Sequence, residues 1–187
     1  NKCPDPENYN FRPSPETGLV HIATSIFESQ FDLIGYEEAQ DNQEEGNALS
    51  IKIAIAVAMA DGSLDDNEGL KINEWIKKKI SFYDSKKKKQ LKDNYNSAMK
   101  EAYRDAKKGD LILSDLTKRL EEIGDKRSKY DTIELCYEVM AADGVAEPEE
   151  LKMIGAIAKS LSLDSSEIEI MRDKQLVNVS SNLSTVS

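Results

Sequence analysis

The stretch Ala58–Leu70, "AMADGSLDDNEGL", joins an almost purely apolar segment to a run of acids. Gly62 can take the left-handed conformation that closes a helix, directly after Asp61. Asp65 is then placed to begin a second helix, whose first turn favours acids because of the helix dipole. The stretch therefore predicts a helix end, a tight turn and a helix start.

A second copy of this stretch lies at a constant offset of 82 residues, so that Asp61 is matched by Asp143. "MADGSLDDNEGLKI" from Met59 corresponds to "AADGVAEPEELKMI" from Ala141. Each copy stands between an apolar segment and an amphipathic one. The sequence therefore predicts a duplicated helical bundle with pseudo-two-fold symmetry. The matched turn positions are Asp61 with Asp143, Gly62 with Gly144, Asp65 with Glu147, and Glu68 with Glu150.

Helix capping does not explain why the seven-residue spacing of Asp61 and Glu68 recurs between Asp143 and Glu150. The fifth and twelfth positions of an EF-hand calcium loop are that far apart, and both coordinate through oxygen. A true EF-hand is not expected, because its first two acids are replaced by apolar residues here. Each copy offers about two or three oxygen ligands, and two copies together would offer about four to six, which suits Ca²⁺ or Mg²⁺.

The apolar segment before the first turn, residues 47–62, fits two structures. Isoleucine, valine and methionine alternate with other residues from Ile51 to Met59, as in a strand. The intervening alanines favour a buried helix, because alanine is the best helix former and a poor strand former. We favour the helix, although periodicity alone does not decide so short a run.

Most other segments carry apolar stripes at helical spacing, so the predicted fold is all-α, a bundle of about seven or eight helices built from two helix–acidic turn–helix halves. Leu70, Ile72, Trp75, Ile76 and Ile80 form one such stripe. We predict three regions: a leader over residues 1–46 with one helix starting at Pro15, a helical domain over 47–175, and a disordered tail over 176–187. Within the leader, "EEAQDNQEEG" (residues 37–46) is predicted to be a polar linker.

The formal net charge of −10 predicts repulsion of nucleic acid and anionic lipid. "KKKK" at Lys86–Lys89 is interpreted as a solvated helix start, although lysines are unfavourable at that end of a helix. No run reaches the roughly 20 apolar residues that span a bilayer, so no direct membrane insertion is expected. The single histidine excludes a multi-histidine zinc site within one chain, and Cys136 is predicted to be a core residue.

The stretches "AMADGSLDDNEGLKI" and "VMAADGVAEPEELKMIGAIA" resemble the tellurite-resistance TerB-like domains, over roughly Ala48 to Lys174. The resemblance implies an all-helical domain of two related halves, with a cluster of acids proposed to bind divalent metal. Members occur in bacterial tellurite and chemical-stress resistance, in phage-defence contexts, and fused to J-domain cochaperones at the membrane. By the motif match, the acidic site residues would be Asp61, Glu68, Asp143 and Glu150, with Asp65 and Glu147 beside them. The leader lies outside the resemblance.

We therefore expect a non-catalytic, cytoplasmic module that binds a divalent cation and other proteins. Enzyme signatures such as a phosphate loop, H-E-x-x-H or a nucleophile elbow are absent from the sequence. Two alternatives stay open. One is a metal-independent interaction scaffold whose acids cap helices and keep it soluble. The other is a small hydrolase that uses the acids and a metal-activated water.

Overall fold

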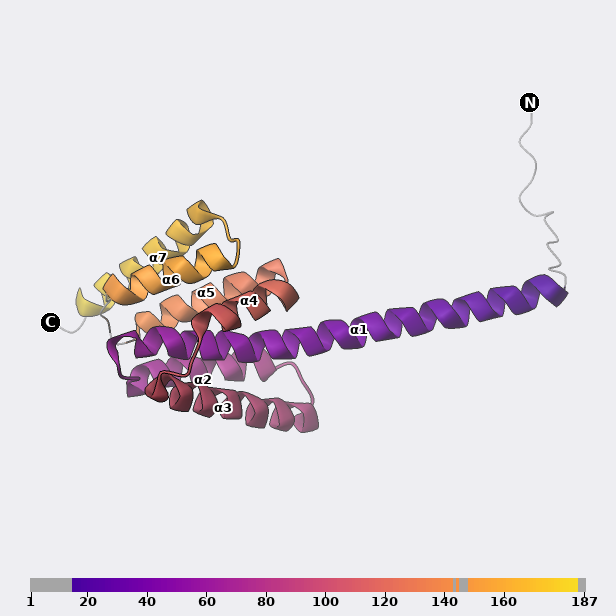
Figure 1. Cartoon of the computed structure of the whole chain (residues 1–187), viewed down its shortest axis with the longest axis horizontal. Helices are drawn as coiled ribbons and strands as arrows, with labels where there is room; N and C mark the ends of the chain where they lie inside the picture. Colours follow the sequence, from indigo (N-terminus) through magenta and orange to yellow (C-terminus); the bar gives the residue numbers. More distant parts are fainter. Residues whose placement is uncertain (1–14, 143, 145–147, 185–187) are drawn as a thin grey trace, which may run out of the picture. The chain divides into compact units, whose positions relative to one another are not determined.

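The computed structural model describes the backbone of residues 15–142, 144 and 148–184, and the side chains of 37–60, 62–142, 144 and 148–177 (Figure 1). Within these residues the chain is entirely helical, as predicted, with seven α-helices, one 3-10 helix and no strand. The helices are α1 (Pro15–Ala58), η2 (Met59–Asp61), α2 (Asp66–Ile80), α3 (Ser85–Lys108), α4 (Leu113–Ile123), α5 (Lys126–Met140), α6 (Pro148–Ser160) and α7 (Ser165–Ser184).

Two compact units divide the chain after Asp41. Of the first unit, the structure describes residues 15–41, which form the N-terminal part of α1. The second unit, Asn42–Ser187, contains the end of α1 and all the later helices, including both acidic turns. None of the described helices is long and apolar enough to cross a membrane.

The end of α1 and the helix α5 form the centre of the second unit. In α1, Ile51, Ile53, Ala54, Ile55 and Val57 are all fully buried, whereas Lys52 and Ala56, on the remaining side of the helix, are partly buried. A helix with so wide an apolar surface is one that other helices largely surround. The choice of helix over strand for residues 47–58 is confirmed, and the alternating isoleucines reflect burial over most of the helix surface. In α5 the same holds for Ile133, Leu135, Cys136, Tyr137, Val139 and Met140.

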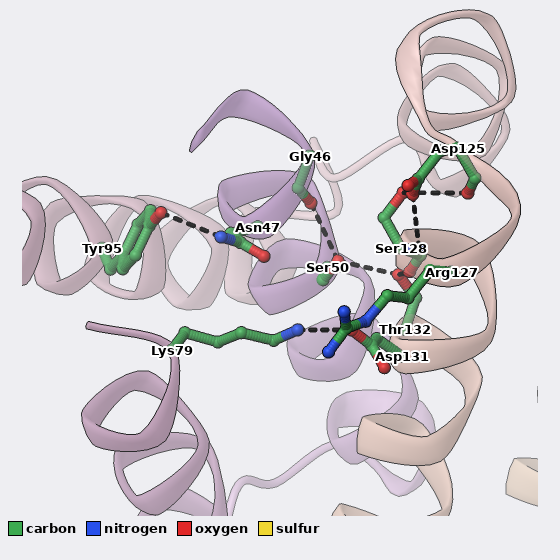
Figure 2. A network of polar contacts seen from close by, with 10 residues as sticks. All are labelled: Gly46, Asn47, Ser50, Lys79, Tyr95, Asp125, Arg127, Ser128, Asp131 and Thr132. Carbon is green, nitrogen blue, oxygen red and sulfur yellow. Dashed lines mark hydrogen bonds and ion pairs between the residues drawn. The ribbon is translucent and has the colours of Figure 1, made fainter. Parts of the chain in front are cut away.

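The 82-residue offset extends well beyond the two turns. It relates the first residue of α2, Asp66, to the first residue of α6, Pro148. It also relates Ser50 to Thr132, and these two buried side chains hydrogen bond to each other with 2.7 Å between their hydroxyl oxygens (Figure 2). A residue can contact its own symmetry mate only near the symmetry axis. The pair therefore marks the pseudo-two-fold axis between α1 and α5.

Three oxygen–oxygen contacts at this axis lie within hydrogen-bond distance. The two hydroxyl groups have only two protons, so two of the three hydrogen bonds form at any one time. Ser50 Oγ lies 2.8 Å from the carbonyl oxygen of Gly46, and Thr132 Oγ1 lies 2.8 Å from that of Ser128. One hydroxyl donates to the other, and the acceptor donates to the carbonyl one turn earlier in its own helix. Either order satisfies both buried groups.

Removing this axis contact is expected to lower the free energy of unfolding. Thr132→Val keeps the side-chain shape but loses the hydroxyl, and Ser50→Ala loses the other partner; each should cost about 1–2 kcal/mol. The double variant should cost less than the sum of the singles by about 1 kcal/mol, because the shared bond is lost only once. Urea unfolding of the four proteins measures this coupling.

Ser160→Ala is the matched control for the axis variants. Its hydroxyl also donates to a carbonyl four residues earlier, that of Ala156, but it is exposed on α6. A change within about 0.5 kcal/mol is expected there. Strictly additive effects of Ser50→Ala and Thr132→Val would contradict a direct bond between the two halves.

Two predicted boundaries are wrong. The polar stretch 37–46 is not a linker but part of α1. Its glutamates, glutamines and alanine are good helix formers. Glu44 pairs with Lys87 at 2.7 Å, and Glu45 binds the Arg119 guanidinium through two hydrogen bonds of 2.7 and 2.8 Å.

The tail expected to be disordered from residue 176 is helical up to Ser184, because no glycine or proline follows Asp164 to end α7.

Candidate metal centre

The first acidic turn is held by backbone geometry and a capping box. Gly62 has a φ of 98°, and its N–H donates to the carbonyl of Met59 at 3.0 Å, which closes the 3-10 turn. Asp65 is the N-cap of α2 and accepts the N–H of Glu68 at 2.8 Å. The Glu68 carboxylate in turn accepts the N–H of Asp65 at 2.8 Å. These two acids therefore stabilise the start of α2 without any ligand.

The second acidic turn repeats the parts of the first that the structure describes. Gly144 has a φ of 84°, and its N–H donates to the carbonyl of Ala141 at 3.2 Å. Pro148 opens α6, with Glu149 and Glu150 in its first turn. The two left-handed glycines confirm the prediction that each turn closes its preceding helix in this way.

Both acidic turns lie at the same end of the helical bundle. In Figure 1 the ends of α1 and α5 and the starts of α2 and α6 are found there. The turn η2 contacts α6, the helix that begins at the other turn. A cation shared between the turns requires this arrangement, since turns at opposite ends of the bundle would be a helix length apart.

Glu68 and Glu150, which the offset relates, are the only carboxylates among the described side chains that are buried, with exposed fractions of 9% and 5%. Acidic side chains are rarely so buried unless they are hydrogen-bonded or bound to a cation. Both also take part in polar interactions within the protein. The recurrence of a buried acid at equivalent positions makes this pair the centre of the candidate site.

The six predicted site residues are described to different extents. Asp65 and Glu68 lie together in the capping box, and Glu150 is buried at the start of α6. The side chain of Asp61 lies outside the described residues, as do Asp143 and Glu147 altogether. Among the side chains that are described, no three acids, histidines or cysteines gather in one cluster. The donors are all carboxylates, a set that fits a hard cation, and a complete site would depend on Asp61 and Asp143.

A groove of about 730 Å³ runs beside the first acidic turn, between α2 and α3. Its apolar lining includes Leu70, which is 58% exposed, together with Met99 and Tyr103. Asp65 and Asp66 line it as well. Leu70 was expected in the core stripe of α2, and the structure corrects this: Leu70 lines the groove instead.

Acids at other helix starts of the chain show what capping does alone. Hydrogen bonds from the hydroxyl and the N–H of Ser128 lower the pKa of Asp125, the N-cap of α5. The N–H groups of Lys87 and Lys86 lower the pKa of Asp84, the N-cap of α3. These carboxylates are stabilised by donors of the chain itself. Capping at Asp65 is therefore not by itself a sign of a metal ligand.

The family comparison matches both acidic turns and the helices that follow them. The model of the family described as tellurite resistance protein TerB matches residues 57–173, more than half of the chain. The chain belongs to the TerB family. No curated protein and no solved structure matches it. The TerB match begins at the end of α1, just before the first acidic turn, and ends within α7, so it covers both acidic turns and the helices α2 to α6.

Sequence reasoning missed the polar pair at the pseudo-two-fold axis. Ser50 and Thr132 each lie eleven residues before the aspartate of their Asp-Gly turn, Asp61 and Asp143, and neither belongs to a recognisable motif. The signal that could have found them is the offset itself. Applied along the whole chain, it pairs Ser50 with Thr132 and Ile51 with Ile133 in the middle of two apolar segments.

Proposed function

We propose that this TerB-family module binds one divalent cation, Ca²⁺ or Mg²⁺, between its two acidic turns, and that it acts without catalysis as a partner-docking or sensing domain in tellurite or chemical-stress resistance. Asp61, Glu68, Asp143 and Glu150 would supply the ligands, with Asp65 and Glu147 beside them. We place the module in the cytoplasm. The observation that carries the proposal is the position of both turns at one end of the bundle, with Glu68 and Glu150 buried there.

Electrostatics supports a cation at this end. Glu68 and Glu150 are buried carboxylates, and burial removes the water that would otherwise stabilise their charge. The positive ends of the α2 and α6 dipoles offset part of this loss of stabilisation. A divalent cation would offset more of it and would accept the carboxylate oxygens directly.

The partner-docking part of the proposal rests on the groove between α2 and α3. Exposed Leu70 and the adaptable Met99 suit the apolar face of a partner helix. Asp65 and Asp66 suit a basic residue at the end of that helix. Because Asp65 belongs to the acidic turn, a bound cation would lie next to the docked partner.

Calorimetric titration of Ca²⁺, Mg²⁺, Mn²⁺ and Zn²⁺ into the chelator-treated full chain tests the metal. We expect Ca²⁺ or Mg²⁺ to bind more tightly than about 1 mM, and the Asp61→Asn/Asp143→Asn variant to lose at least about tenfold in affinity. If none of the four ions binds more tightly than the millimolar range, the metal proposal fails.

A metal-independent scaffold is the second candidate, and the capping box favours it. Asp65 and Glu68 satisfy each other's backbone N–H groups, which gives both acids a structural role. Under this alternative the groove binds its partner equally well after chelation. Partner binding measured with and without chelator therefore separates the two candidates.

A further inference from the structure

Positive charge is concentrated at the turn between α2 and α3. The segment Lys77–Lys92 holds eight lysines and one aspartate, a formal charge of +7, which leaves −17 for the rest of a chain whose total is −10. The overall charge predicted repulsion of anionic surfaces. The distribution of that charge gives this one turn the opposite sign from the rest of the chain.

A phenylalanine stands at the tip of the same turn. Phe82 is 91% exposed, the most exposed of the large apolar side chains described. The backbone around it is fixed: Ser81 N–H donates to the carbonyl of Lys78 and Tyr83 N–H to that of Ile80, both at 3.3 Å. Asp84 then caps α3. The turn therefore holds an apolar ring in water without using it in the core.

The start of α3 adds to the positive potential. Its first turn contains no acid, as is also true of α5, and it begins the run Lys86–Lys89. Lysines there add to the positive end of the helix dipole, which costs helix stability but favours an anion outside the protein. Lys87 is paired with Glu44, while Lys86 and Lys89 are exposed.

The acidic turns do not cancel this potential. They lie at the other end of α2, whose 15 residues span roughly 22 Å. The Debye length at physiological salt is about 8 Å, so charges at that separation are largely screened from each other. Acids of neighbouring helices pair with two lysines of the segment, Lys79 with Asp131 and Lys87 with Glu44. The charge that meets an approaching surface is therefore that of the exposed lysines beside Phe82, namely Lys77, Lys78, Lys86 and Lys89.

We propose that the α2–α3 turn docks on the surface of an anionic lipid bilayer, with Phe82 inserted at the boundary between headgroups and acyl chains. Lysine side chains around it, Lys77, Lys78, Lys86 and Lys89 foremost, contact the headgroup phosphates. An exposed aromatic side chain with lysines on both sides of it in the sequence is a combination that binds such interfaces, because apolar burial and electrostatic attraction add together.

A nucleic acid fits the same turn less well. Proteins that bind single strands use several aromatic residues along a basic groove. Here one ring stands at a tip, and the neighbouring Tyr83 is half-buried. Phenylalanine also has no polar group with which to read a base edge.

Sedimentation of the full chain with vesicles tests the proposal. We expect binding to vesicles of phosphatidylcholine mixed with phosphatidylglycerol, weaker binding as salt rises, and none to phosphatidylcholine alone. Phe82→Ser should weaken the binding of the protein to vesicles about tenfold, because the variant has no phenyl ring to transfer from water into the bilayer. Lys86→Gln/Lys89→Gln should weaken it about 25-fold, at about fivefold for each lysine near the surface.

Lys107→Gln/Lys108→Gln is the matched control, with the same change in charge on exposed lysines at the other end of α3. Its affinity for the vesicles should lie within about twofold of that of the unchanged chain, because those lysines are farther than a Debye length from the docked bilayer. Phe82→Trp provides a second measurement. The emission of the new tryptophan should shift to shorter wavelength when the protein binds vesicles, whereas the emission of the buried Trp75 should stay constant.

Three results would overturn the proposal. One is the absence of binding to phosphatidylglycerol vesicles. Another is an equal loss of vesicle binding in Lys107→Gln/Lys108→Gln and in Lys86→Gln/Lys89→Gln, which would mean that binding follows net charge alone. The last is Phe82-dependent binding to an oligonucleotide together with indifference to vesicles. Chelation should leave vesicle binding unchanged, so the test is independent of the metal proposal.

Discussion

Ile133→Ala is expected to lower the free energy of unfolding by about 3–4 kcal/mol, and Ile51→Ala by a similar amount. Both side chains have an exposed fraction of 0% and lie next to the axis pair of Ser50 and Thr132. Each truncation removes about three methyl or methylene groups from a close-packed site on a central helix, where the surroundings relax only partly. Urea unfolding followed by helical circular dichroism measures both losses.

The comparison between the two variants matters more than either value. Since the offset relates the two isoleucines, their costs should agree within about 1 kcal/mol. Leu70→Ala is the control, because Leu70 is 58% exposed on α2 and its loss should change stability by less than about 1 kcal/mol. A large loss at Ile133 with a small one at Ile51 would mean that the two halves are not equivalent in the folded state.

Helix content and the duplicated plan could be predicted because they depend on local patterns. The Asp-Gly turns at Asp61 and Asp143 and their common offset can be read directly from the sequence. The residues that surround a helix come from distant parts of the chain, which is why periodicity alone did not decide between strand and helix for residues 47–62, although their alanines favoured the helix. The end of α1 is buried by helices that follow later in the chain: Asn47 hydrogen bonds to Tyr95 in α3, and Ser50 to Thr132 in α5.

The predicted linker was wrong for the same reason. Polarity over residues 37–46 is equally compatible with a linker and with a helix exposed on one side. What distinguishes them is that Glu44 and Glu45 find partners in α3 and α4, at Lys87 and Arg119. Such pairings across the fold leave no mark in the local sequence.

The acidic residues of the candidate site could be named from the sequence, but their arrangement could not. The spacing of Asp61 and Glu68 fixes only what happens within one turn. Whether the second turn lies nearby depends on α1 and α5 ending at the same end of the bundle, and the contact of η2 with α6 reflects that arrangement. The partition of charge along α2, acidic at its start and basic at its end, likewise matters only once the helix is folded.

Saturating metal is expected to stabilise the chelator-treated protein by about 2.7 kcal/mol when the free ion is at a hundredfold excess over its Kd. An ion held between two turns binds only the folded state, because unfolding separates carboxylates that lie 82 residues apart in the sequence. For a chain of this size the gain corresponds to a rise of about 8 °C in Tm. Thermal unfolding with Ca²⁺, with Mg²⁺ and with chelator measures it.

The Asp61→Asn/Asp143→Asn variant should lose the metal-dependent gain but unfold close to the unchanged chain in chelator, since the glycines and the capping box that close the first turn are intact. The control is Asp84→Asn/Asp164→Asn, which removes the same charge from two N-caps, those that precede α3 and α7. Because asparagine caps a helix about as well as aspartate, this variant should keep both its stability in chelator and its full response to metal, since neither cap lies in an acidic turn. If both double variants respond to metal as the unchanged chain does, the acids of the two turns serve only as helix ends, and the metal-independent scaffold is the correct account.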